Sequence, residues 1–187
     1  MPNPTEVLAA TGDGLIAIVK RDCPTCELAG PVLATLQQAG QLDVYSQDDP
    51  SFPEQVSKVI DDRELAVSYN LDVEIVPTLI RVQSGKETDR TYGWDSAEWS
   101  RVAGQPVGEG LPPIRPGCGA ANVEPAALRM LKIRHGETGL TARSVTLGGE
   151  EDDIEAAFAR DWSDGLPVVP PTEARVLAML EGTSRDS

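Results

Sequence analysis

The chain has 187 residues, a formal net charge of −14 and 40% hydrophobic residues. A chain of this size buries an ordinary core and has room for one domain with a substantial extension. Its negative charge repels phosphate backbones and anionic lipid surfaces, so neither nucleic acid nor a membrane is an expected partner. The cysteines are few, the first residues lack the pattern of a secretion signal, and no apolar run approaches the about 20 residues that span a bilayer. We therefore expect a cytoplasmic protein.

The first 46 residues predict helix, strand, helix and strand in turn. Residues 4–10 form a short helix. Residues 14–20 contain an unbroken apolar run, which is typical of a central strand buried on both faces. From Pro24 to about Ala39 apolar side chains recur at helical spacing, and residues 42–46 predict the second strand.

The next part of the chain predicts the rest of an α/β domain. Residues 54–69 are mostly helical in pattern, and residues 77–82 and 87–92 predict a third and a fourth strand. Asp95 begins a capping box for a helix that runs to Val102. This order predicts an α/β fold with a four-stranded mixed sheet flanked by helices on both faces.

A stretch rich in glycine and proline, from Gly104 to Gly119, marks the expected domain boundary. We assign residues 1–104 to the first domain and residues 105–187 to a C-terminal extension that packs on it. The extension is expected to be mainly helical, with helices at 125–132, 150–160 and from Thr172 to Gly182, and a strand at 141–147.

Cys23 and Cys26 stand where the first apolar strand gives way to a helix. A helix that begins at Pro24 places Cys23 at its N-terminus, where unpaired N–H groups and the helix dipole favour a thiolate, the reactive form of cysteine. Two intervening residues bring Cys26 almost one helical turn round, close enough to attack a mixed disulfide formed at Cys23. The pattern predicts dithiol–disulfide exchange, with Cys23 as the nucleophile and Cys26 as the resolving thiol.

Three further features accompany this motif within residues 4–104: Pro31 five residues after Cys26, the run Ile75-Val76-Pro77-Thr78, and Gly93 ahead of the last helix. With them, this part of the chain resembles the thioredoxin family. The resemblance implies a thioredoxin-like fold and a thiol-disulfide oxidoreductase that acts on disulfides of proteins or small molecules. It also implies that no metal or organic cofactor is needed and that electrons come from a separate reductase or a small thiol.

The resemblance also assigns a substrate-binding role to Val76 and Pro77. In that family the proline that matches Pro77 is cis and lies against the cysteine pair. A cis bond before proline costs only about 0.5–1 kcal/mol over trans. The peptide group of Val76 is then free to pair with the extended backbone of a substrate.

Several departures from the family's reductases support a second hypothesis. Asp22 stands where those proteins usually have tryptophan, Pro24-Thr25 replaces Gly-Pro, and Ala17 occupies the place of a buried aspartate. The alternative is a redox-quiet adaptor, in which the fold is a scaffold and the proline-rich extension docks a partner enzyme.

Charges beside the cysteine pair leave its redox potential open. Asp22 and Glu27 flank the motif and oppose formation of a thiolate. Lys20 and Arg21 offset that effect if they fold back toward the sulfurs. The direction of exchange, reducing, oxidising or isomerising, is therefore not assigned.

Cys118 lies between Gly117 and Gly119, which permit close approach of another group. One interpretation is a third redox thiol that traps Cys23 or Cys26, and the other is an unreactive thiol packed into the extension or exposed on it. A further alternative joins the three cysteines and His135, the chain's one histidine, in a structural zinc site. Otherwise His135 belongs to a solvated polar turn.

Two apolar, proline-rich stretches, Gly110 to Ile114 and Gly165 to Val169, suit extended docking strands. Residues 161–172, with Trp162 as an aromatic anchor, are a candidate site for another protein. The same segment resembles a stretch of larger bacterial proteins of unassigned function, which raises the hypothesis that the chain is one module of a longer polypeptide or complex.

Overall fold

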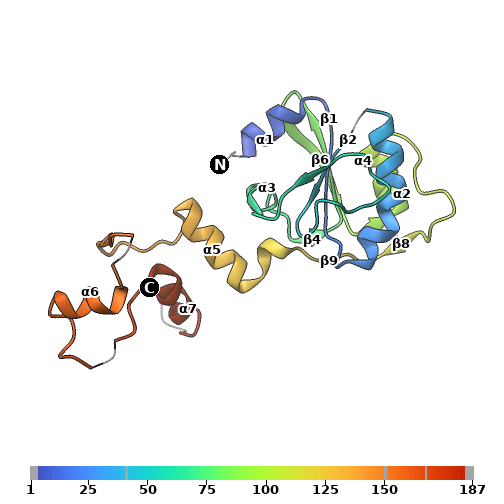
Figure 1. Cartoon of the computed structure of the whole chain (residues 1–187). Coiled ribbons are helices and arrows are strands. Elements are labelled where there is room, and N and C mark those ends of the chain that lie inside the picture. Colours follow the sequence, from blue (N-terminus) through green and yellow to red (C-terminus); the bar gives the residue numbers. More distant parts are fainter. Residues whose placement is uncertain (1–3, 41, 150, 167, 184–187) are drawn as a thin grey trace. The chain divides into compact units, whose positions relative to one another are not determined.

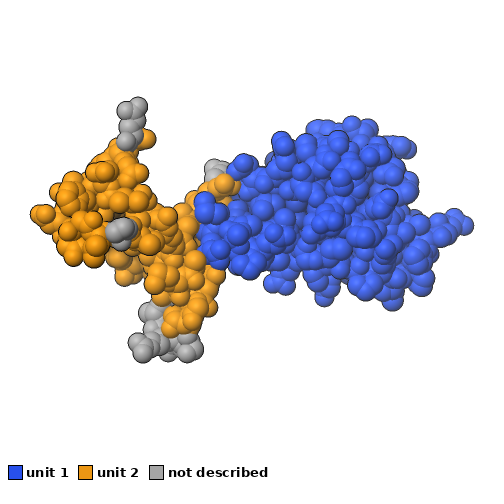
Figure 2. All heavy atoms as spheres, turned by 60° about the horizontal axis from the view of Figure 1, so that its bottom comes forward, with its two compact units in different colours: residues 1–131 blue, residues 132–187 orange. Residues whose placement is uncertain are grey.

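The computed structural model describes residues 4–40, 42–149, 151–166 and 168–183, in two compact units, residues 1–131 and 132–187 (Figure 2). Residues 105–131 therefore lie in the same unit as the sheet. The division into domains at residue 104 stays a prediction. Among the described helices, none has the length and apolar character needed to cross a membrane.

The first unit is an α/β structure built on a mixed five-stranded sheet (Figure 1). Its strands are β1 (Gly14–Val19), β2 (Leu42–Ser46), β3 (Val59–Asp61), β5 (Thr78–Gln83) and β6 (Lys86–Tyr92). Their order is β3-β2-β1-β5-β6, with β1, β2 and β3 mutually parallel and β5 antiparallel to both β1 and β6. Every residue of β1 from Leu15 to Val19 is buried, as its continuous apolar run predicts.

Helices lie on both sides of this sheet. They are α1 (Pro4–Thr11), α2 (Pro24–Gln38), α3 (Ala66–Asn70) and α4 (Ser96–Ala103). In Figure 1, α2 and α4 lie on one side of the sheet, and α1 and α3 on the other. Asp95 caps α4 as predicted, because its carboxylate accepts hydrogen bonds from the N–H groups of Ala97 and Glu98.

The sheet has one strand more than predicted, because residues 54–69 are not mostly helical. Val59 to Asp61 form β3, which pairs in parallel with β2. Branched side chains at Val59 and Ile60 suit this extended edge. The helix begins only after Asp62, whose buried carboxylate accepts hydrogen bonds from the N–H groups of Val67 and Ser68.

Residues 104–131 continue over the first unit without forming a further layer. Two short antiparallel pairs hold them: β7 (Trp94–Asp95) with β8 (Ile114–Arg115), and β4 (Ile75–Val76) with β9 (Cys118–Gly119). A turn of 3-10 helix (Ala121–Val123) and helix α5 (Pro125–His135) follow, and α5 runs past the end of this unit. The stretch from Gly110 to Ile114 thus ends in an extended strand, and its docking role stays a prediction.

Trp94, in β7, and Trp99, in α4, both belong to the core. Both are fully buried, with ring centroids 5.0 Å apart. The indole N–H of Trp99 donates to the Gly93 oxygen over 2.8 Å, and that of Trp94 donates to the Pro112 oxygen over 2.7 Å. Each buried ring therefore has a partner for its polar atom.

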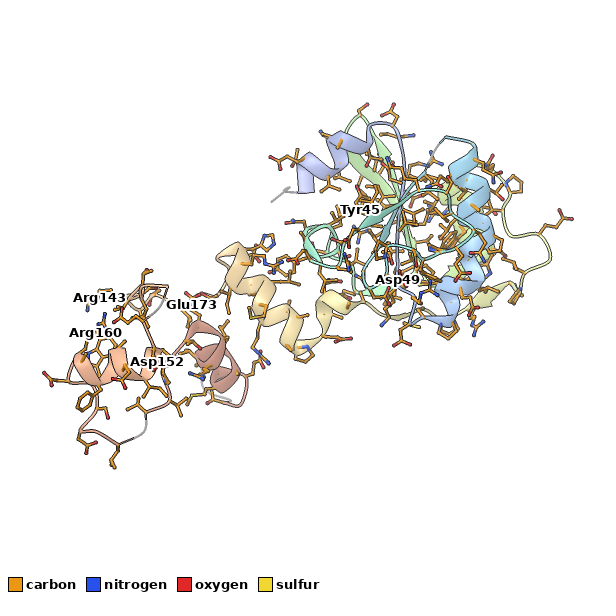
Figure 3. The ribbon with its side chains drawn as sticks, viewed as in Figure 1. Tyr45, Asp49, Arg143, Asp152, Arg160 and Glu173 are labelled. Carbon is orange, nitrogen blue, oxygen red and sulfur yellow. The ribbon has the colours of Figure 1, made fainter. Side chains whose placement is uncertain are left out.

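The second unit contains α6 (Asp153–Ala159) and α7 (Glu173–Leu180). Asp152, labelled in Figure 3, caps α6, and Thr172 caps α7 as predicted. The strand expected at 141–147 is wrong, since these residues form neither helix nor strand. Extended backbone becomes a strand only where a neighbour satisfies its N–H and C=O groups. Glu150, in the helix predicted for 150–160, lies outside the described residues.

Candidate functional site

Both cysteines of the motif lie where helix α2 begins, just after strand β1. Cys23 is the N-cap of α2, in extended conformation, and Pro24 opens the helix. Proline suits this position because the first N–H groups of a helix have no partner within it. Cys26 follows in the first turn. The exposed fraction is 1% for Cys23 and 0% for Cys26, so both sulfurs are covered by the rest of the chain.

The environment of Cys23 favours its thiolate. A hydrogen bond from the Cys26 thiol, ahead of one from Cys118, lowers the pKa of Cys23 to about 5, and burial opposes this shift. The backbone N–H groups of Cys26 and Thr25, at the start of α2, lower the pKa further. These donors favour the thiolate of Cys23, which is the form that acts as a sulfur nucleophile.

Cys26 has the opposite character. Burial raises the pKa of Cys26 well above the ordinary value, and the hydrogen bond and charge of Cys23 raise it further. Cys26 thus stays protonated while Cys23 is charged. The two thiols differ because hydrogen bonds outweigh the effect of burial at Cys23, whereas burial is the largest influence on the pKa of Cys26.

Arg21 does not fold toward the sulfurs. Its guanidinium donates to Asp49, labelled in Figure 3, over 2.6 Å, and also to Glu54 over 3.4 Å and Ser51 over 3.3 Å. The low pKa of Cys23 therefore comes from thiol and backbone donors rather than from this cation.

Val76 and Pro77 lie directly beside the cysteine pair. The peptide bond between them is cis, as the resemblance implies, and a second cis bond joins Phe52 and Pro53. The carbonyl oxygen of Val76 is 3.6 Å from the Cys23 sulfur. Val76 itself is fully buried, because strand β9 pairs with it.

Cys118 lies in β9, opposite Val76 in the antiparallel register. The Cys118 thiol contributes to the lowered pKa of Cys23, and Cys118 is partly exposed while the other two cysteines are buried. Burial, followed by the hydrogen bond to Cys23, raises the pKa of Cys118. The structure therefore brings together Cys23, Cys26, Cys118, Val76 and Pro77, the full set of site residues selected from the sequence.

Gly117 allows β9 to lie this close to β4. A Cβ atom at Gly117 would stand 2.4 Å from Ile75 Cγ2 and 2.6 Å from the Val76 oxygen. A Cβ atom at Gly93, whose φ is +65°, would stand 2.9 Å from the nitrogen of Gly117. Gly119 has open space instead. The close approach expected of the two glycines beside Cys118 thus depends on Gly117 alone.

Residues 112–122, here called the covering segment, are anchored on both sides of β9. On one side the Thr25 hydroxyl donates to the Pro116 oxygen over 2.6 Å. On the other, the N–H of Ala120 donates to the Glu74 oxygen over 2.9 Å, and the amide of Asn122 donates to the Val73 oxygen over 2.8 Å.

A buried amide pair completes the second anchor. The side chain of Gln47 donates to that of Asn122 over 2.9 Å and accepts from the N–H of Ala121 over 2.9 Å. Both amide side chains are buried, so removing either leaves polar atoms without partners. The covering segment is therefore a packed part of the first unit.

The zinc alternative finds no support in the side-chain geometry. Within the part of the chain that the structure describes, no group of three or more His, Cys, Asp or Glu side chains is placed to hold a metal ion. His135 is the last residue of α5 and is half-buried, so the solvated turn expected for it is wrong. Helix α5 extends three residues past its predicted end.

Residues 161–172 form neither helix nor strand where they are described, and Pro167 lies outside the described residues. Trp162, Leu166 and Val169 are exposed, and the guanidinium of Arg160 lies 5.8 Å from the centre of the Trp162 ring. Binding of another protein here stays a prediction.

The contribution of Thr25 and the covering segment was not found from the sequence. Thr25 stands between the cysteines, yet nothing in the motif reveals that its hydroxyl binds a residue 91 positions away. The available signal was the pair of glycines around Cys118. These glycines indicated that another part of the chain lies close to Cys118, but they did not indicate which part.

A search against protein-family models and a search of curated proteins find no match. Among solved structures, the chain is similar to a thioredoxin of Malassezia sympodialis, with 16% identity and a TM-score of 0.37 over 57% of this chain and 87% of that one. It is also similar to an uncharacterized conserved protein from Geobacillus kaustophilus, with 15% identity and a TM-score of 0.36 over 57% of this chain and 75% of that one.

Proposed function

We propose that this protein is a thiol-disulfide oxidoreductase with a thioredoxin-like fold, in which Cys23 is the nucleophile and Cys26 the resolving thiol. The observation that carries the proposal is the position of Cys23 at the N-cap of α2, with Cys26 in the first turn of the same helix, and the pKa values of the two thiols differ accordingly. The pKa of Cys23 is lowered to about 5 while that of Cys26 is raised. A charged attacker beside a protonated thiol is the arrangement that two-step exchange requires.

In the reducing direction, the Cys23 thiolate attacks one sulfur of a substrate disulfide. A Cys23–substrate bond forms, the substrate S–S bond breaks, and the first substrate thiolate leaves. Cys26 then loses its proton and attacks Cys23, which releases the second substrate thiolate. The products are a Cys23–Cys26 disulfide and two substrate thiols, and a separate reductase or small thiol supplies two electrons to restore the dithiol.

The mixed disulfide itself prepares Cys26 for its step. Burial is the largest cause of the raised pKa of Cys26, and the hydrogen bond and negative charge of Cys23 raise it further. Both contributions end when Cys23 becomes part of a neutral disulfide. The pKa of Cys26 then falls, which makes loss of its proton easier after the first attack than before it.

Substrate selection is assigned to Val76 and Pro77. An extended substrate segment pairs with the backbone of Val76, and the absent N–H of Pro77 leaves room for it. In the described arrangement β9 occupies that place. Direct attack on an external disulfide by Cys23 therefore requires β9 to move.

A redox-quiet adaptor is the second candidate, and the burial of both motif sulfurs favours it. In that case the covering segment is a permanent part of the core, and the cysteines serve packing. Buried structural cysteines are inert. The two candidates therefore differ in whether Cys23 reacts with a disulfide in the folded protein.

The test uses the full chain with a single motif cysteine left in place. The Cys26→Ser/Cys118→Ser variant is incubated at pH 7 with glutathione disulfide, and adducts are read by protein mass. We expect one glutathione on Cys23 that dithiothreitol removes. In the matched Cys23→Ser/Cys118→Ser variant, Cys26 should react roughly tenfold or more slowly, because its raised pKa keeps it protonated. Equal and negligible labelling of both variants would support the adaptor instead.

A further inference from the structure

Strand β9 lies where the proposed function places a substrate. Cys118 is the antiparallel partner of Val76, the residue assigned to pair with a substrate backbone, and the Val76 oxygen is 3.6 Å from the Cys23 sulfur. The residue in register with Val76 thus carries a thiol. The charge of Cys23 also contributes to the raised pKa of Cys118, after burial, which is consistent with two neighbouring sulfurs.

We propose that β9 is a built-in occupant of the substrate site and that Cys118 is a third catalytic thiol, which forms a disulfide with Cys23 within the chain. This inference rests on the proposed function. Cys118 is the partly exposed member of the three cysteines.

The proposed exchange needs no oxidant or reductant other than the disulfide that Cys118 attacks. When Cys23 is joined to Cys26, the Cys118 thiolate attacks the Cys23 sulfur, the Cys23–Cys118 bond forms, and Cys26 leaves and takes up the proton that Cys118 lost. When Cys23 carries an external thiol, the same attack releases that thiol. Its disulfide has then been reduced by two electrons, and Cys23 and Cys118 have been oxidised together.

Specific packing and hydrogen bonds hold β9 beside β4. Only glycine fits at position 117 beside Ile75 and the Val76 oxygen, and Thr25 binds the Pro116 oxygen from the motif itself. The buried amides of Gln47 and Asn122 hold the far end. These contacts fix Cys118 opposite Val76, whose carbonyl oxygen lies 3.6 Å from the Cys23 sulfur.

The test compares the full-chain Cys26→Ser variant with Cys26→Ser/Cys118→Ser, each treated with glutathione disulfide at pH 7. Trypsin leaves Cys23 in peptide 22–58 and Cys118 in peptide 102–129, because the Arg115–Pro116 bond resists cleavage. In Cys26→Ser we expect these two peptides joined by a disulfide, with glutathione released. In the double variant we expect a stable glutathione adduct on Cys23.

The outcomes separate the two proposals. A stable glutathione adduct on Cys23 in both variants, with no joined peptides, overturns the role of Cys118 and leaves the proposed function standing. An unreactive Cys23 in the double variant overturns the proposed function, and the inference with it. Joined peptides in Cys26→Ser together with an adduct in the double variant support both.

Gly117→Ala tests whether β9 blocks the site, with Gly119→Ala as the matched control. The added methyl group clashes with β4 at position 117 and meets open space at position 119. In the Cys26→Ser/Cys118→Ser background, Gly117→Ala should raise the rate of glutathione addition to Cys23 severalfold, and Gly119→Ala should leave it unchanged. Equal rates in the two variants would mean that β9 does not control access to Cys23.

Discussion

Cys118 and Val76 face each other as partners in the antiparallel pair of β4 and β9. This relationship joins two parts of the chain that are more than 40 residues apart. It covers the Cys23 sulfur with the chain's own backbone and puts a third thiol beside it. The reactivity of the motif therefore depends on the covering segment as well as on the motif itself.

The pH dependence of Cys23 alkylation should follow its lowered pKa. The rate with iodoacetamide, read on peptide 22–58, should be half-maximal near pH 5, because hydrogen bonds from Cys26 and Cys118 favour the thiolate. Cys26→Ala removes the largest of these contributions and should move the midpoint upward. Arg21→Gln is the control and should leave it in place, since Arg21 binds Asp49. A midpoint at the ordinary cysteine value of about 8.5 in the unsubstituted protein would contradict this account.

The same thiolate should contribute to folding stability above pH 5. The pKa of Cys23 is lower in the folded protein than in the unfolded chain, so its stabilising effect is complete above the unfolded pKa and is lost as the pH falls through about 5. Under reducing conditions, the free energy of unfolding of the unsubstituted protein minus that of Cys23→Ser should increase from pH 5 to pH 9. Urea denaturation at several pH values measures it, and a flat or falling difference would refute the prediction.

Thr25→Val should loosen the covering segment. Valine keeps the shape of the buried side chain and removes the hydroxyl that donates to the Pro116 oxygen. One hydrogen bond of this kind is worth about 1 kcal/mol. We expect that loss in urea denaturation, together with faster labelling of Cys118 by a maleimide. Thr35→Val, which removes a hydroxyl bonded within α2 to Pro31, should leave the labelling rate unchanged.

Gly108 and Gly110 offer a matched pair for the loop that leads into the covering segment. Both have positive φ, +76° and +82°. A Cβ atom at Gly108 would stand 2.4 Å from the Trp94 ring, whereas one at Gly110 meets nothing within 4 Å. Either alanine costs about 1–2 kcal/mol for the left-handed backbone. Gly108→Ala should cost about 1–3 kcal/mol more, because it crowds a packed ring. Equal unfolding free energies for the two variants would show that this loop does not pack on Trp94 as described.

The sequence predicted the parts of the fold that depend on local patterns. Three features could each be predicted from a few neighbouring residues: the apolar run of β1, the proline at the start of α2 and the Asp95 N-cap of α4. The edge strand β3 was missed because its three residues lie in a stretch whose apolar spacing also fits a helix. Only its pairing with β2 distinguishes the two readings.

The residues of the candidate site could be selected from the sequence, but the way that β9 covers them could not. The motif, Val76, Pro77 and Cys118 were selected from local features. That Cys118 pairs with Val76 is a contact between distant segments, which no spacing rule encodes. The same holds for the hydrogen bond from Thr25 to Pro116. The sequence could indicate the reactive groups, whereas their mutual arrangement comes from tertiary packing.

Redox titration of the full-length Cys118→Ser variant tests the central claim most directly. The protein is equilibrated in glutathione buffers with a series of oxidised-to-reduced ratios and is then quenched with acid and digested. The mass of peptide 22–58 is measured at each ratio. The account predicts that this peptide passes fully and reversibly from the dithiol to an internal Cys23–Cys26 disulfide, with the loss of two hydrogen atoms. If both sulfurs stay reduced at every ratio while the protein remains folded, the pair does not exchange disulfides.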